Sequence, residues 1–197
     1  VEKKPVTAVV TAAAKTYDGT TNAAVTATLQ SSDLVGNDNV TITLTGSNFE
    51  DANAGTDKKV NVNSNSPVFT GSTGHENYNI TYPATTTASI FKADIDQTKV
   101  TAPAAATGLT YTGKPLALVT AGSSPEGTME YSLDDKSYSV SIPTGTDAGD
   151  YDVWYRVKGD SNHNDTAGAK LDDQVTIAKQ EVTAPIIEFI PSGAAYN

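Results

Sequence analysis

The chain has 197 residues, enough for one large domain or two of roughly 95 residues each. It contains no cysteine, which excludes disulfides, thiolate metal sites and thiol redox chemistry. Its formal net charge is −10, from 13 Lys and Arg against 23 Asp and Glu, and this argues against nucleic-acid partners, which require clustered positive charge. No segment approaches the ~20 apolar residues of a membrane-spanning helix, so we expect no direct membrane insertion.

The first half of the chain predicts half-buried strands. Residues 25–29 and 40–45 alternate apolar side chains with threonines, so one face of each strand is expected in a core and the threonine face in solvent. Val60 and Val62 continue this pattern. Because no helical period lies between the strands, we expect an all-β fold.

The second half predicts a hairpin and a central strand. Residues 129–133 and 138–142 flank a polar turn at 134–137, which is typical of a hairpin. Residues 151–157 form the clearest strand, with Trp154 expected on its outer face.

An internal repeat organises the chain. Three motifs recur 94 residues apart: Val6–Ala8 as Val100–Ala102, Thr16–Gly19 as Thr110–Gly113, and Asn53–Gly55 as Asp147–Gly149. Two later matches are closer together in the sequence. Asn77–Asn79 corresponds to Asn162–Asn164 at a spacing of 85 residues, and Ile90 corresponds to Ile177 at a spacing of 87 residues. We therefore expect domains at 1–97 and 98–180, followed by the start of a third repeat at 181–197, where Val182–Pro185 repeats Val100–Pro103.

The sequence Asp147–Val153 resembles the tyrosine corner of immunoglobulin-like sandwiches, in which the hydroxyl of a tyrosine, here Tyr151, bonds the upstream backbone. The first repeat has no tyrosine after Gly55. We expect two tandem immunoglobulin-like antiparallel β-sandwich domains; the alternative is a β-grasp arrangement, which would require a helix.

These motifs also carry a family resemblance. Tyr17, Asp18 and Gly19, followed by Asn53, Gly55 and Asn77-Tyr78, resemble the YDG-type domain of bacterial surface proteins and large adhesins. Tyr111, Gly113, Asp147, Gly149 and Tyr151 are similar to MBG-type and immunoglobulin-like repeats of cell-wall proteins from Gram-positive bacteria. The resemblance implies an extracellular, cell-wall or surface-associated, multi-repeat protein, and implies no ligand or cofactor.

The sequence offers few candidates for chemistry. It has no G-x-S-x-G elbow, H-E-x-x-H motif or Gly-rich phosphate loop, and His75 and His163 lie in Asn-rich loops where a structural role is the simpler interpretation. We therefore expect no enzymatic activity and no cofactor.

Two binding sites are conceivable. Oxygen ligands for calcium could come from Asp160, Asn162, Asn164 and Asp165, although Leu171 stands where such a loop carries its bidentate glutamate. An exposed Trp154 could stack on a sugar ring.

The leading functional hypothesis is a non-catalytic stalk or spacer, a monomer whose partners are neighbouring repeats of the same protein. The alternative is an adhesive module that binds mucin, a host glycan or a protein.

Overall fold

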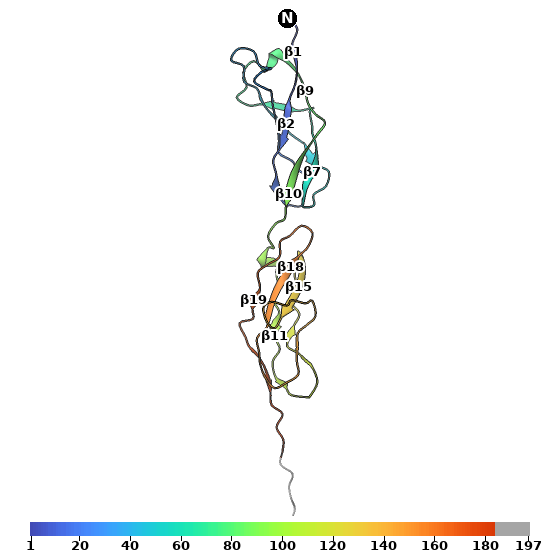
Figure 1. Ribbon diagram of the computed structural model, residues 1–197, viewed down its shortest axis with the longest axis vertical. Coiled ribbons are helices and arrows are strands. Elements are labelled where there is room, and N and C mark those ends of the chain that lie inside the picture. Colours follow the sequence, from blue (N-terminus) through green and yellow to red (C-terminus); the bar gives the residue numbers. More distant parts are fainter. Residues whose placement is uncertain (184–197) are drawn as a thin grey trace, which may run out of the picture. The chain divides into compact units, whose positions relative to one another are not determined.

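The computed structural model describes residues 1–183 (Figure 1). The protein is all-β, as the sequence predicts, with 44% of the described residues in strands or bridges and 3% in helices. Residues 184–197, which carry most of the expected third repeat, lie outside the described residues.

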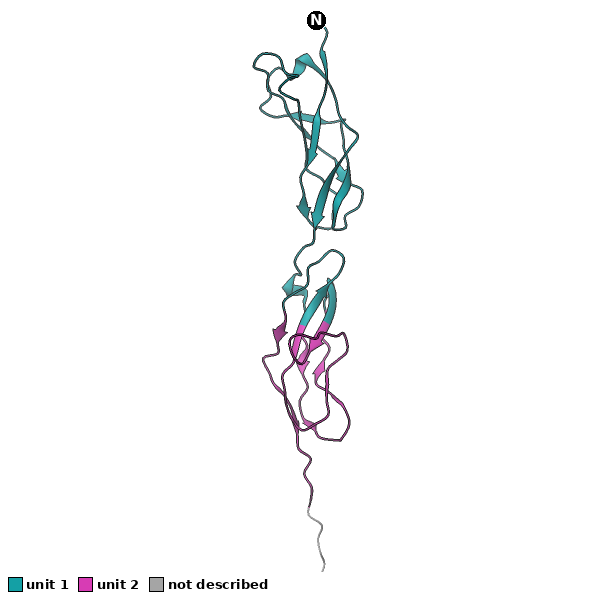
Figure 2. Cartoon of the chain, in the orientation of Figure 1, with its two compact units in different colours: residues 1–100, 124–129, 156–167 teal, residues 101–123, 130–155, 168–197 magenta. Residues whose placement is uncertain are grey.

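The chain forms two compact units (Figure 2). Unit 1 comprises residues 1–100, 124–129 and 156–167, and unit 2 comprises 101–123, 130–155 and the residues from 168 onward. Two segments of the second repeat therefore pack within unit 1, an arrangement that a single boundary at residues 97 and 98 does not describe. The domain limits inferred from the repeat remain a prediction.

Unit 1 contains two four-stranded sheets and one strand pair. One sheet has the order β2 (Val9–Ala12), β4 (Val25–Thr28), β5 (Thr41–Leu44) and β8 (Pro67–Phe69), all antiparallel. The other has the order β3 (Lys15–Thr16), β10 (Thr85–Phe91), β7 (Gly55–Asn61) and β6 (Asn48–Phe49), in which β3 pairs parallel with β10. The remaining pair is parallel, between β1 (Lys4–Thr7) and β9 (Tyr78–Thr81).

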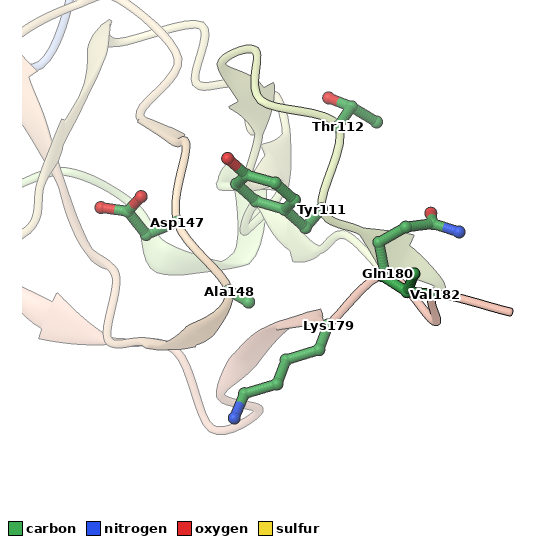
Figure 3. A pocket seen from close by; sticks show the side chains of 7 residues that line it. All are labelled: Tyr111, Thr112, Asp147, Ala148, Lys179, Gln180 and Val182. Atoms are coloured by element: carbon green, nitrogen blue, oxygen red, sulfur yellow. The ribbon is translucent and has the colours of Figure 1, made fainter. Parts of the chain in front are cut away.

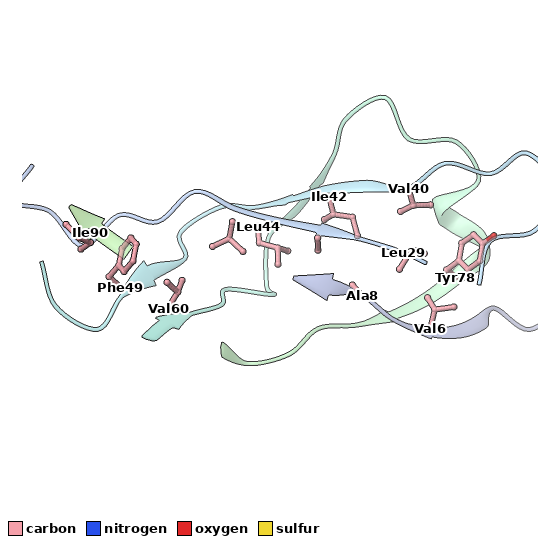
Figure 4. Packing of buried hydrophobic residues seen from close by; sticks show 12 residues of the cluster. Val6, Ala8, Leu29, Val40, Ile42, Leu44, Phe49, Val60, Tyr78 and Ile90 are labelled. Carbon is pink, nitrogen blue, oxygen red and sulfur yellow. The ribbon is translucent and has the colours of Figure 1, made fainter. Parts of the chain in front are cut away.

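The core of unit 1 is made by alternating apolar side chains (Figure 4). Ile42 and Leu44 of β5 and Ala27 of β4 are fully buried, whereas the threonines between them are exposed, which confirms the alternation predicted for both strands. Phe49 is the largest fully buried side chain, at 1% exposure, and Val60 of β7 is buried with it.

Unit 2 contains shorter strands. A three-stranded sheet has the order β12 (Leu109–Thr110), β20 (Val175–Ala178) and β17 (Gly149–Tyr151). Two pairs join β11 (Ala104–Ala105) to β14 (Val119–Thr120) and β13 (Leu116–Ala117) to β16 (Thr144–Gly145). In a further sheet of order β15 (Gly127–Ser132), β18 (Trp154–Gly159) and β19 (Ala169–Lys170), β15 and β18 each run from one unit into the other.

The strand predicted over residues 151–157 is interrupted. β17 ends at Tyr151 and pairs with β20, whereas β18 begins at Trp154 and pairs with β19. Val153 lies in the break and is 1% exposed. The alternating pattern reports which side chains are buried, and it persists while the chain changes from one sheet to another, so the pattern alone could not reveal the break.

The predicted hairpin forms only in part. Asp134 accepts hydrogen bonds from the backbone N–H groups of Lys136 and Ser137 and so forms the expected turn. Beyond the turn, however, a single bridge between Tyr131 and Ser139 replaces the strand predicted at 138–142.

The tyrosine corner is present in the second repeat, because the Tyr151 hydroxyl donates to the carbonyl of Asp147 at 2.8 Å. Within residues 1–183 the helical segments are two 3-10 turns, His75–Asn77 and Gln97–Lys99. The helix that a β-grasp arrangement requires is not among them, so that alternative is wrong for this part of the chain. Neither turn is long or apolar enough to cross a membrane.

The two repeats share a local backbone framework. β3 and β10 pair parallel, with Phe91 opposite Thr16, and β12 and β20 pair parallel, with Ala178 opposite Thr110. The next residue continues each pair in the same way: Tyr17 N–H donates to the Phe91 carbonyl at 2.8 Å, and Tyr111 N–H donates to the Ala178 carbonyl at 2.9 Å. The third strand matches as well, since Gly55 pairs with Ile90 and Gly149 with Ile177.

Candidate functional site

A loop of the second repeat, residues 160–164, binds the end of the first repeat inside unit 1. We call this contact the loop junction. Its centre is a parallel bridge between Ala93 and His163, in which Ala93 N–H donates to the Asn162 carbonyl at 3.0 Å. Asn164 N–H donates to the Ala93 carbonyl at 2.8 Å, so the chain leaving the first repeat is hydrogen-bonded on both sides of Ala93.

The side chain of Asn162 forms a second set of hydrogen bonds with the first repeat. Its Oδ1 accepts from the Ala54 N–H at 2.9 Å, and its Nδ2 donates to Asn53 Oδ1 at 3.2 Å. Asp51 fixes the turn that presents these partners, because its Oδ1 accepts from both Asn53 N–H and Lys58 Nζ at 2.8 Å. The Lys58 hydrogen bond, with help from Asn53, holds the pKa of Asp51 below its usual value.

Lysine and amide groups close the junction around the loop. Lys92 Nζ donates to the carbonyls of Asp160 (2.8 Å) and His163 (3.1 Å). Asn164 Nδ2 donates to Asp94 Oδ1 at 2.9 Å. The loop is therefore bound both through its backbone N–H and carbonyl groups and through the side-chain amides of Asn162 and Asn164.

His163 packs on the tyrosine of the Tyr-Asp-Gly motif. Its ring lies 5.4 Å from the Tyr17 ring in an edge-to-face arrangement, and its side chain is 12% exposed. Nδ1 lies 2.7 Å from Asp160 Oδ1, and Nε2 lies 3.9 Å from Glu126 Oε2. Burial by itself would raise the pKa of Asp160, but the hydrogen bonds from His163 and the Asn162 backbone lower it.

Glu126 is the other carboxylate beside His163. It accepts from Lys99 Nζ at 2.7 Å and from Asp96 N–H at 2.8 Å, and the hydrogen bond from Lys99 is the main cause of its lowered pKa. Glu126 is ion-paired with Lys99 and Asp160 is hydrogen-bonded to the His163 ring, so the surroundings of His163 are consistent with a structural loop role.

His75, the other histidine for which the sequence favours a structural role, lies in a different environment from His163. Its ring stacks on Phe69 at 4.2 Å, and its Nδ1 lies 3.5 Å from Glu76 Oε2 without a hydrogen bond. The structure does not bring His75 and His163 together into one site.

The Tyr-Asp-Gly motif is a turn that places Tyr17 against the junction. Asp18 Oδ1 accepts from Lys15 Nζ (2.8 Å) and from the Thr20 N–H (2.9 Å), and these bonds lower the pKa of Asp18 to about 2. Gly19 follows with φ of 74°, a left-handed conformation that favours glycine, and Gly113 has the same φ in the second repeat.

The four candidate calcium ligands are directed at protein partners. Asp160 and Asn162 bind at the junction, and Asn164 binds Asp94. Asp165 accepts from Lys158 Nζ at 2.9 Å and from the Gly159 N–H at 3.0 Å. In residues 1–183 there is no cluster of three or more histidine and carboxylate side chains that could hold a metal ion.

Trp154 is half-buried and lies opposite Lys170 of β19. Lys170 Nζ lies 5.5 Å from the centroid of the indole ring, in a cation–π arrangement. One face of Trp154 is thus covered by a neighbouring side chain, which reduces the surface that could stack on a sugar.

Unit 2 contains a pocket of about 780 Å³ (Figure 3). It is lined by Tyr111, Thr112, Asp147, Ala148, Lys179, Gln180 and Val182. Tyr111 is 41% exposed and Val182 is 90% exposed. Sequence reasoning identified Tyr111 and Asp147 as structural motif residues, but it did not predict that they would line a pocket.

The comparisons with known proteins identify one domain. The family model of the YDG domain matches residues 2–88. Searches of curated proteins and of solved structures gave no match. The matched segment contains the Tyr17 turn, the Asn53 turn and the core of unit 1, and it follows that residues 2–88 form a YDG domain.

Proposed function

We propose that this protein is a non-catalytic, extracellular repeat module that acts as a stalk or spacer in a bacterial cell-surface protein. The loop junction is the observation that carries the proposal. Here one repeat is attached to the next by at least six hydrogen bonds, through Ala93, Ala54, Lys92 and the loop 160–164, and not by a flexible linker alone. A YDG domain at residues 2–88 agrees with this role.

The second repeat, at residues 98–180, is proposed to be a module of the MBG or immunoglobulin-like type. Two observations support this assignment. The Tyr151 hydroxyl makes the bond of a tyrosine corner, and β12, β20 and β17 repeat the pairing of β3, β10 and β7.

The described residues offer little for catalysis. The pocket of unit 2 carries one carboxylate, Asp147, and one amine, Lys179, without a histidine, serine or cysteine beside them. A nucleophile needs a base within hydrogen-bonding reach, and the Thr112 hydroxyl of this lining hydrogen-bonds the Lys114 backbone instead of Asp147 or Lys179. Binding and spacing are therefore better supported than turnover.

The spacer role is tested by display on a Gram-positive cell. An epitope is placed beyond one, two or three tandem copies of the chain, and antibody access is measured by flow cytometry. We expect access to rise with each added copy, and to rise less for an unstructured linker with the same number of residues, because a random coil extends only as the square root of its length. Equal access for all lengths would contradict the proposal.

The adhesive alternative makes a separate prediction. Saturable binding to mucin or to a glycan array that is abolished by Trp154→Ala, and retained in Tyr111→Ala, would favour adhesion through the Trp154 face. Absence of saturable binding supports the spacer.

A further inference from the structure

The pocket of unit 2 is built from the same positions as the loop junction of unit 1. At the spacing of 94 residues, Tyr111 corresponds to Tyr17 and Ala148 to Ala54. At the spacing of 87 residues, Lys179 corresponds to Lys92. The other lining residues follow the same rule: Thr112 matches Asp18, Asp147 matches Asn53, Gln180 matches Ala93 and Val182 matches Ile95.

The backbone holds the two sets of residues in the same way. The parallel pairs β3·β10 and β12·β20 have the same register, and each is followed by an equivalent hydrogen bond from Tyr17 or Tyr111. On the other edge of β10 and β20, Gly55 pairs with Ile90 and Gly149 pairs with Ile177, which are corresponding residues of the two repeats. The correspondence is therefore one of structure as well as of sequence.

In unit 1 these positions bind a loop. Ala54 N–H binds Asn162 Oδ1, Lys92 Nζ binds two loop carbonyls and Tyr17 contacts the His163 ring. Ile95, just beyond, is 6% exposed.

In unit 2 the equivalent groups are displayed at the surface. Val182 is 90% exposed, against 6% for Ile95, and Tyr111 is 41% exposed whereas Tyr17 is half-buried. The Ala148 N–H has no hydrogen-bond acceptor among residues 1–183. The pocket thus offers one donor for an amide oxygen, a carboxylate for an amide nitrogen, a lysine for carbonyls, and the exposed apolar side chains of Tyr111 and Val182.

The geometry points to this pocket as the docking site for an asparagine-bearing loop of a following module, bound as loop 160–164 is bound in unit 1. The inference rests on the proposed stalk function and names the surface by which such a stalk would continue. The sequence supports a module as the occupant, because Val182–Pro185 repeats the Val100–Pro103 segment that opens the second repeat.

The first repeat carries a loop with suitable chemistry. Asn77 is exposed, and it stands where Asn162 stands in the second repeat. The next residue, Tyr78, pairs parallel with Lys4, as His163 does with Ala93. Val6 lies two residues after Lys4, as Ile95 lies two residues after Ala93, and both are buried. In the strand pairing Val6 thus takes the place of Ile95, although in the sequence repeat it matches Val100 and Val182.

A tandem chain tests the inference. Residues 1–181 are joined directly to residues 6–183 of a second copy, so that Val6 takes the position of Val182 and every other lining residue is retained. The short connection raises the effective concentration of the Asn77 loop at the pocket to about millimolar. Amide exchange at Ala148 and the solvent accessibility of Tyr111 are measured by NMR in the single and the tandem chain.

Docking predicts that exchange at Ala148 of the first copy slows by about tenfold or more in the tandem chain, as expected for one added hydrogen bond. The protection is lost with Asn77→Ala in the second copy and kept with Asn65→Ala, which changes another exposed asparagine of that copy. Unchanged exchange at Ala148, while Ala54 of the second copy stays protected, would overturn the inference, as would protection that is indifferent to Asn77→Ala. The epitope-access experiment does not depend on this pocket, so failure of docking and failure of the stalk role give different results.

Discussion

Replacing Asn162 by alanine removes both side-chain hydrogen bonds at the centre of the loop junction. The bond from Ala54 N–H, at 2.9 Å, is partly buried, and the bond to Asn53 Oδ1, at 3.2 Å, is exposed. Loss of the acceptor leaves the Ala54 N–H without a partner, which costs about 1–3 kcal/mol, whereas loss of the exposed bond adds little.

This cost should appear locally. If the junction opens before unit 1 unfolds, exchange at the Ala54 and Ala93 amides accelerates by about 5- to 150-fold, the factor that corresponds to 1–3 kcal/mol. Native-state hydrogen exchange followed by NMR measures both amides in the same sample. Asn162→Asp keeps an acceptor for Ala54 but sets a carboxylate beside Asn53 Oδ1, so it should fall between the wild type and Asn162→Ala.

The matched control is Asn77→Ala. Asn77 occupies the corresponding position in the first repeat and is exposed there, so exchange at Ala54 and Ala93 should remain within about twofold of the wild type. The reasoning is refuted if Asn162→Ala leaves both amides as protected as Asn77→Ala does.

Three further predictions concern stability. Phe49→Ala should destabilise unit 1 by about 3–5 kcal/mol in urea unfolding, because a 1%-exposed ring is removed, while the exposed Phe91→Ala changes it by less than about 0.5 kcal/mol; equal effects would contradict the core assignment. Tyr151→Phe should cost unit 2 about 0.5 kcal/mol, the lower end for a hydrogen bond, because the bond to the Asp147 carbonyl is exposed; a small fall in melting temperature is expected, and an unchanged transition would show that the corner is not stabilising. The pKa of Asp18 is lowered from 3.8 to about 2, so the stability that its carboxylate contributes to the fold is present above pH 3.8 and is lost as the pH falls through about 2. Asp18→Asn should therefore lower the urea midpoint at about pH 5 but have little effect at about pH 2. A difference that does not depend on pH would count against this reasoning.

The sequence predicted much of the core because local burial has a local signature. Strict alternation in residues 40–45 indicated which side chains of this segment face inward, and the structure confirms this for Val40 and for Ile42 and Leu44 of β5. The Tyr151 hydrogen bond was also predictable, since its donor and acceptor are four residues apart.

The features that escaped prediction depend on distant partners. Periodicity at 151–157 could not show that Tyr151 and Trp154 would join different sheets, and the strand expected at 138–142 found a single bridge. The junction escaped for the same reason: Asn162 and Ala54 are 108 residues apart, and neither has a local signal of contact.

The repeat nevertheless contained a clue to the junction. Tyr17 recurs as Tyr111 and the Asn53–Gly55 segment as Asp147–Gly149 at the same spacing of 94 residues, and motifs that keep one spacing are expected to share a contact or a turn. Their structural positions, beside Asn162 and His163, agree with that expectation.

The parallel pairing of β3 with β10 has a mechanical consequence. β3 lies near the start of the first repeat and β10 is its last strand, and the two run in the same direction. Tension that pulls the start of β3 and the end of β10 apart therefore loads their hydrogen bonds in shear, all at once, instead of opening them one after another like a zipper. The same holds for β12 and β20, so in both pairs resistance to such a pull is set by the unfolding rate and not by the equilibrium stability.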